Sequence, residues 1–452
     1  MTALLLLFAV CCAALPAAEV AAALPAIWLA QSTLLGGHEE IFMAGPVHVT
    51  MADMILLTLL AKMSFSVVRT RAWIAHRPLY FALAIFVIVN LLATLAAGVK
   101  FGAGPMVHGL TALGRLGSEM AIVPILAQTV RSLVQARRCV RILLFTLGVL
   151  AAIQFINFFG ASHGIIIGEV QGIERGEVRY FGPVGDSVGS VLLLGYLCAL
   201  CFSSVLGVGA FFGGIVLTAG LGAIFSTGIG TVIFLLFGVR ASAARSFISR
   251  YFWLLPALAF AALIAVVTIG KPLSQTLIDR LSGGNYARSA DQRNASAGLA
   301  VAMLADNLAT GVGYMGYEAA LARYGGEKFF DLAHPDGGTA NANNQILQSL
   351  TDAGVPGFLA CVGLIVCAAR LLRAAGAQCG DRFLATFYLG AFLWLLTQAF
   401  GNQAAVWLTP ASYVARMLWI ILGTAVAVTK LLPAKLPVLS PAARPESPLV
   451  PA

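Results

Sequence analysis

Arginines and possible acid–base side chains stand in the polar segments of a chain that is otherwise strongly hydrophobic. Arg179 precedes an aromatic residue and a Gly-Pro turn in RYFGPVG. The polar segment from Lys271 to Leu347 holds Arg280, Arg288, Arg293, His334 and Asp336. A guanidinium group stays charged and presents a planar fork of donors to phosphate oxygens. A histidine with an ordinary pKa of about 6.5 suits proton transfer. These residue types predict recognition of a phosphate-bearing molecule, although an ion pair or headgroup contact of Arg179 is the alternative.

Composition sets the class of protein that positions these residues. The chain of 452 residues is 60% hydrophobic and only 10% charged, with a mean hydropathy of +0.90. Apolar runs near the roughly 20 residues that a helix needs to cross a bilayer recur along the chain, whereas barrel strands would give alternating segments of about 10. We predict an all-α integral membrane protein with about twelve transmembrane helices and one large periplasmic loop subdomain between late helices.

The expected organisation has four parts. Residues 1–270 form the N-terminal part of the transmembrane bundle, 271–347 the periplasmic loop subdomain, 348–431 the C-terminal part of the bundle, and 432–452 a disordered cytoplasmic tail rich in proline. The apolar run from Met1 to Ala14 has no preceding basic residue, which favours a retained helix over a cleaved signal peptide.

Basic residues predict the orientation, because short connections rich in Lys and Arg stay in the cytoplasm. Segments between the basic connections, among them Val99 to Glu119 and the long polar segment, are expected to face outward. The formal charge of +9 is therefore explained by topology, and nucleic-acid binding is not expected. The basic connections contain Arg69, Arg71, Arg77, Arg131, Arg137, Arg138, Arg141, Arg240, Arg245, Arg250, Arg370, Arg373, Arg382, Lys430 and Lys435.

Cysteine and histidine usage argues against a metal or cofactor site. The eight cysteines lie in spans or in expected cytoplasmic segments, and the six histidines show no ligand spacing such as HExxH. No metal and no cofactor is therefore expected.

The long polar segment is expected to contain a helix from about Ser296 to Leu308, with Arg288 and Arg293 just before it. Free N–H groups at a helix N-terminus attract anions, so these arginines could complete an anion cradle there. The following GVGYMG fits GxGxxG, but no strand precedes it, so it is interpreted as a turn rather than a dinucleotide site.

Three sequence segments resemble the bacterial O-antigen ligases and O-antigen or exopolysaccharide polymerases, a family of multispanning transferases of lipid-linked glycans. RYFGPVGDSVGS is similar to the Arg-aromatic-x-Gly-Pro loop before a span, and RNASAGLAVAMLADNLATGVGYMGY is similar to the family's Arg, helix and Gly-Val-Gly run. NNQILQSLTDAGVPG resembles the motif His-Asn-x-x-Leu-x-x-Leu-x-Glu-x-Gly-x-x-Gly.

The resemblance implies an enzyme, a metal-independent glycosyltransferase of the bacterial inner membrane whose active site faces the periplasm. Its donor would be an undecaprenyl-diphosphate-linked glycan, and its acceptor a glycan or lipid A core hydroxyl. Membrane lipids surround it. By position, Arg179 and Arg293 would bind the diphosphate, with Arg288 and Arg280 as helpers. Fixed cations can stabilise the charge that develops on such a leaving group.

The main departure from the family pattern is Asn343, which stands where the family has its motif histidine. An amide cannot act as a general base near neutral pH. His334, Asp336 and Asp352 are the remaining catalytic candidates, together with Asn343 by position. The loss of the histidine keeps two other functions open: a transporter or flippase, and a non-catalytic binding subunit, for a lipid-linked polysaccharide.

Overall fold

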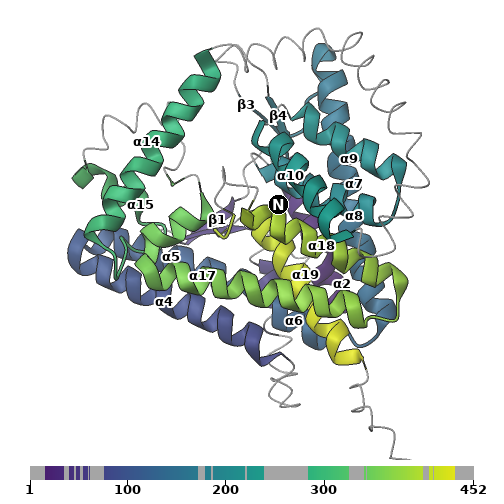
Figure 1. Ribbon diagram of the computed structural model, residues 1–452, viewed down its shortest axis with the longest axis horizontal. Coiled ribbons are helices and arrows are strands. Elements are labelled where there is room, and N and C mark those ends of the chain that lie inside the picture. Colours follow the sequence, from purple (N-terminus) through teal and green to yellow (C-terminus); the bar gives the residue numbers. More distant parts are fainter. Residues whose placement is uncertain are drawn as a thin grey trace, which may run out of the picture.

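The protein is described by a computed structural model, shown in Figure 1. The described residues are 16–34, 40–44, 47–50, 54–59, 61, 76–171, 179–184, 187–218, 221–238, 284–324, 341–342, 344–400, 407–410 and 412–432. The expected tail at 433–452 and the expected helix at Met1 to Ala14 lie outside them.

In this described part the chain is helical apart from two short antiparallel hairpins. The strands are β1 (Glu40–Ala44) with β2 (Val47–Thr50), and β3 (Glu169–Gln171) with β4 (Arg179–Gly182). The helices are α2 (Ala17–Leu34), α4 (Arg77–Phe101), α5 (Ala103–Met120), α6 (Ile122–Thr129), α7 (Leu133–Gly160), η1 (Ala161–His163), α8 (Val188–Cys201), α9 (Val205–Leu217), α10 (Leu221–Gly238), α14 (Gly284–Asp306), α15 (Tyr317–Ala320), η4 (Leu321–Tyr324), α17 (Gln345–Gln378), α18 (Arg382–Phe400) and α19 (Tyr413–Leu431).

The helices define a multi-pass membrane protein. Among the described residues, six segments are long and apolar enough to cross a bilayer: Arg77–Phe101, Ala103–Thr129, Leu133–Gly160, Gln345–Gln378, Arg382–Phe400 and Tyr413–Leu431. Three shorter apolar helices, α8, α9 and α10, follow the hairpin of β3 and β4. The sequence prediction of a helical membrane protein is thus confirmed.

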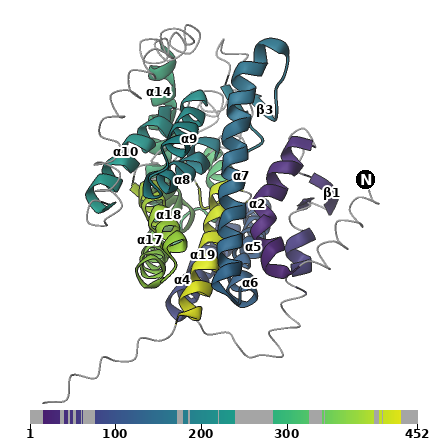
Figure 2. The same cartoon turned by 90° about the vertical axis from the view of Figure 1, so that its right-hand side faces the viewer.

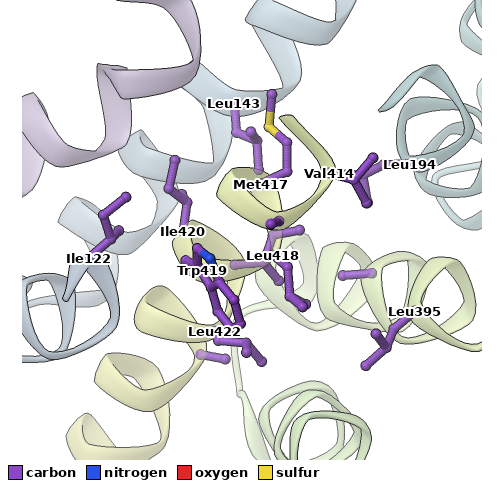
Figure 3. Close-up of a cluster of buried hydrophobic side chains, with 14 of the residues drawn as sticks. Ile122, Leu143, Leu194, Leu395, Val414, Met417, Leu418, Trp419, Ile420 and Leu422 are labelled. Atoms are coloured by element: carbon purple, nitrogen blue, oxygen red, sulfur yellow. The ribbon is translucent and has the colours of Figure 1, made fainter. Parts of the chain in front are cut away.

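Helix α19 lies at the centre of the bundle. Every residue from Tyr413 to Val428 is buried. Figure 3 shows its apolar side chains beside those of neighbouring helices, including Ile122 of α6, Leu143 of α7 and Leu194 of α8. Figure 2 shows α19 between α7 and α17. A helix whose side chains are mostly apolar around its whole circumference is expected in such a central position.

One expectation about the connections is wrong. The stretch from Val99 to Glu119 is not an exterior connection, because α4 continues to Phe101 and α5 begins at Ala103. Glycines and charged residues lower the hydropathy of α5, but Leu113, Leu116 and Met120 form its buried face. This face packs antiparallel along α4, where Gly109 lets Thr94 approach closely.

The expected start of the helix in the long polar segment is also wrong. Helix α14 begins at Gly284 rather than near Ser296, so Arg288 and Arg293 lie within the helix and not before its N-terminus. Ala, Arg and Gln are good helix formers, which accounts for the earlier start. The anion cradle predicted from free N–H groups beside Arg293 is therefore absent at that position.

The connections at one end of the bundle are held together by charged residues. Arg137 in the first turns of α7 donates to the Asp381 carboxylate before α18, with Nε 3.0 Å from Oδ2. The guanidinium of Arg141 lies 5.7 Å from the centre of the Phe383 ring. The basic residues at the start of α7 therefore lie at the same end of the bundle as the connection between α17 and α18, as the charge pattern predicts.

Candidate functional site

A turn after α14 docks against a break in α17, and this contact joins two of the three segments singled out in the sequence. The N–H of Val312 donates to the carbonyl of Thr351 at 2.8 Å, and that of Gly313 donates to the carbonyl of Asp352 at 2.9 Å. In return, the N–H of Val355 donates to the carbonyl of Leu308 at 2.9 Å. GVGYMG is a turn, as predicted, and it completes the backbone hydrogen bonds that the break in α17 leaves open.

Two glycines make this close approach possible. Gly354 has a φ of 63° and a ψ of −158°, which interrupts α17, and Pro356 follows it. A Cβ on Gly354 would lie 2.3 Å from the carbonyl oxygen of Leu308, and one on Gly311 would lie 2.4 Å from the backbone of Asp352. Only glycine adopts this backbone conformation without strain and leaves room for the opposing chain.

Asp352 is part of this packing. Its side chain is 3% exposed and accepts a hydrogen bond from Gln348 Nε2 at 2.7 Å. The backbone N–H of Met315, a residue with a φ of 55°, also bonds to this carboxylate. Gln348 in turn accepts from the N–H of Ala342 at 2.8 Å. This environment favours a structural role for Asp352, holding the turn, over contact with an acceptor hydroxyl.

The start of α17 binds the segment that leads into α19. Asn344 caps the helix, because its Oδ1 accepts from the N–H of Leu347 at 3.0 Å. Gln345 Oε1 accepts from the N–H groups of Trp407 and Leu408 at 2.8 and 2.7 Å. The motif NNQILQSLTDAGVPG therefore contacts both the turn and this segment.

Arg179 lies in a hairpin that is fixed at the end of α7. In β4 it pairs with Gln171 of β3, and Asn157 of α7 exchanges two hydrogen bonds with Ile167 before β3, at 2.9 and 2.7 Å. Gly182 has a φ of 63°, and a Cβ there would lie 2.7 Å from Gln154 Nε2. The Gly-Pro turn after Arg179 is thus seated directly on α7.

Arg293 is exposed on α14, and the end of that helix is fastened to α4. Lys100 Nζ donates to Asn307 Oδ1, and Arg323 donates to the carbonyl of Lys100. The Arg323 guanidinium also lies 4.6 Å from the centre of the Phe101 ring. In Figure 1, α14 and the hairpin of β3 and β4 lie on the same side of the long pair formed by α4 and α17.

A buried ion pair lies where α5 meets α19. Arg416 Nε is 3.0 Å from Glu119 Oε1, and both side chains are 1% exposed. The Arg416 guanidinium also lies 5.4 Å from the centre of the Tyr413 ring. Ionisable residues within membrane spans are costly and commonly functional. The sequence offered a signal for Arg416, a charged residue inside the apolar run that forms α19, but not for its partner.

The structure therefore describes only part of the predicted site. Arg280, His334, Asp336 and Asn343 lie outside the described residues, as do the side chains of Arg179 and Arg288. The structure does bring together the backbones of GVGYMG and NNQILQSLTDAGVPG, two of the sequence motifs. Within the described part, no group of three or more His, Cys, Asp or Glu residues could hold a metal ion.

The sequence was compared with protein-family models and with curated proteins. No family model matches the chain, and no curated protein matches it significantly.

Proposed function

We propose that this multi-pass membrane protein is a glycan ligase or polymerase. It transfers a glycan from undecaprenyl diphosphate to an acceptor hydroxyl, on lipid A core or a growing polysaccharide, at the periplasmic face of the bacterial inner membrane. The proposed enzyme has about twelve transmembrane helices, and its segment from Lys271 to Leu347 forms a periplasmic subdomain.

The observation that carries the proposal is the docking of GVGYMG on NNQILQSLTDAGVPG. The two segments were singled out independently in the sequence, and two backbone hydrogen bonds join them, from Val312 to Thr351 and from Gly313 to Asp352. A third joins Val355 to Leu308, which comes shortly before GVGYMG. This contact supports one common site rather than two unrelated loops.

In the proposed reaction, the acceptor oxygen forms a bond to the anomeric carbon of the donor glycan, and the bond from that carbon to the diphosphate oxygen breaks. Arg179 and Arg293 bind the diphosphate and stabilise the charge that develops on it as it leaves. The acceptor hydroxyl loses its proton to His334 or Asp336, because Asp352 is enclosed by Gln348 and the turn.

The test is a transfer assay with the purified protein in liposomes that contain an undecaprenyl-diphosphate-linked glycan and a lipid A core or glycan acceptor. We expect release of undecaprenyl diphosphate by the wild type. Arg179→Ala and Arg293→Ala should each reduce the rate by about 100-fold or more, the scale typical for loss of one group that stabilises transition-state charge.

Arg373→Ala is the matched control, because Arg373 is an exposed arginine near the opposite end of α17. Its rate should equal that of the wild type. Binding of the donor lipid without release of the diphosphate would contradict the proposal and favour a transporter or a binding subunit.

A further inference from the structure

Three buried tyrosines link the segments that carry the two diphosphate-binding arginines. Tyr317 Oη donates to the carbonyl of Ser296 at 2.8 Å, Tyr314 Oη donates to the carbonyl of Leu408 at 3.1 Å, and Tyr413 Oη donates to the carbonyl of Pro183 at 3.3 Å. All three tyrosines are buried, at 2%, 3% and 6% exposure.

These hydrogen bonds form one path through the fold. Ser296 lies one turn after Arg293 on α14, and Tyr317 follows the docked turn that contains Tyr314. Leu408 precedes Tyr413, the first residue of α19, in the chain. Pro183 comes directly after β4, the strand of Arg179. The path therefore runs from the helix of one arginine to the strand of the other.

The middle of this path is held from both sides. Gln345 accepts from the N–H groups of Trp407 and Leu408, which fixes these two residues to α17. Arg416, one turn after Tyr413, pairs with Glu119 and lies over the Tyr413 ring. Leu408 and Tyr413 are therefore each fixed to the bundle, and together they can hold the elements that they contact at a set separation.

The hydroxyl groups of Tyr314 and Tyr317 are well suited to this role because they keep their protons. Burial raises the pKa of Tyr317 to about 12, and burial, followed by the charge of Asp352, raises the pKa of Tyr314 well above its ordinary value. The hydroxyls of Tyr314 and Tyr317 therefore remain donors across the physiological range. At all three positions a Tyr→Phe change removes the donor while keeping the ring.

We infer that Tyr314, Tyr317 and Tyr413 are positioning residues that hold the Arg179 strand and the Arg293 helix at the separation required by one diphosphate. The inference rests on the proposed function for the ligand, but the mechanical linkage is testable without it.

The first test measures hydrogen–deuterium exchange of the full-length protein in nanodiscs, without substrate. Tyr413→Phe should speed exchange of residues 179–184, and Tyr317→Phe should speed exchange of residues 293–300. Tyr314→Phe should speed exchange of residues 407–410. Each rise should be about two- to ten-fold, which corresponds to one lost hydrogen bond. Tyr196→Phe is the control, because the hydrogen bond of Tyr196 Oη, at 2.9 Å, joins α8 to Thr231 of α10.

The second test is the KM for the undecaprenyl-diphosphate glycan. Because the tyrosines position the two arginines, which bind the donor diphosphate and stabilise the charge that develops on it, each of the three variants should raise the KM and lower kcat, each by about two- to ten-fold. Tyr196→Phe should change neither constant.

The outcomes separate the linkage from the chemistry. Unchanged exchange at 179–184 in Tyr413→Phe, or an equal KM change in Tyr196→Phe, overturns the inference even if the protein is a transferase. Faster exchange at the stated segments supports the linkage even if no transfer is detected, and in that case only the proposed function fails.

Discussion

At the scale of single residues, backbone conformation matters as much as the charged groups. Gly354 and Gly311 occur in segments that the sequence marks by their glycine content, and both have a φ of 63°. Their role is to let the turn after α14 and the break in α17 exchange hydrogen bonds. A side chain at either position would push the turn away from α17 and break these hydrogen bonds. GVGYMG and NNQILQSLTDAGVPG would then no longer be held against each other.

We therefore predict that Gly354→Ala lowers the free energy of unfolding by about 3 kcal/mol or more, because it combines a glycine-only conformation with a steric clash. The new Cβ would meet the Leu308 carbonyl oxygen at 2.3 Å. Gly363→Ala is the matched control on the same helix, where nothing lies within 4 Å of the added carbon. Thermal unfolding in detergent measures both; equal unfolding temperatures for the two variants would refute the role of Gly354.

At the scale of elements, the start of α19 joins α5, the hairpin of β3 and β4, and α17. The Glu119 and Arg416 pair is the charged part of that junction. Removing one partner of a buried ion pair leaves a desolvated charge, whereas removing both can be nearly neutral.

Arg416→Met should therefore destabilise the protein by about 3–5 kcal/mol, and Glu119→Gln combined with Arg416→Met should recover much of that loss. The comparison is with the exposed pair of Arg138 and Glu19, at 62% and 32% exposure, where Arg138→Ala should cost less than about 1 kcal/mol. Unfolding curves of the single and double variants give the coupling energy between Glu119 and Arg416. If the losses of stability from the two single substitutions simply add up in the double variant, the two residues do not form a buried ion pair.

The contact between α7 and α18 predicts a pH dependence of stability. Burial alone would raise the pKa of Asp381, but hydrogen bonds from Arg137 and from the N–H groups of Leu384 and Phe383 outweigh it and lower the pKa below the ordinary 3.8. A lowered pKa in the folded state means that the contribution is fully present above about pH 3.8 and is lost as pH falls below that value.

Asp381→Asn should therefore lower the free energy of unfolding above about pH 3.8. It should also make that free energy depend less on pH below this value. Thermal unfolding between about pH 2 and pH 6, a range that extends on both sides of the ordinary carboxyl pKa, provides the measurement. A wild type and an Asp381→Asn protein with parallel pH profiles would contradict this assignment.

At the scale of the whole molecule, some features followed from the sequence and others did not. The membrane class, the turn at GVGYMG and the shared side of the basic connections before α7 and α18 were predicted, because hydropathy, glycine spacing and charge are local properties. Helix α5 was missed because its buried face is hidden by polar residues on the other face. The partner of Arg416 was missed because Glu119 is 297 residues away in the chain.

The same arrangement predicts which ends of the bundle lie on opposite sides of the membrane. Gly380, in the connection held by Arg137 and Asp381, and Ile166, beside the hairpin of Arg179, are both exposed. They lie near opposite ends of the bundle, because Arg137 is in the first turns of α7 and Ile166 follows its last residue, Gly160.

We expect a membrane-impermeant maleimide to label Ile166→Cys in intact spheroplasts and Gly380→Cys only in inverted vesicles, because the basic end of the bundle stays in the cytoplasm. The wild type supplies the background, since five of its six described cysteines are buried. Labelling of both positions from one side would contradict the topology. Labelling of Gly380→Cys alone in spheroplasts would put the Arg179 hairpin in the cytoplasm, where a donor glycan on the periplasmic face cannot reach it.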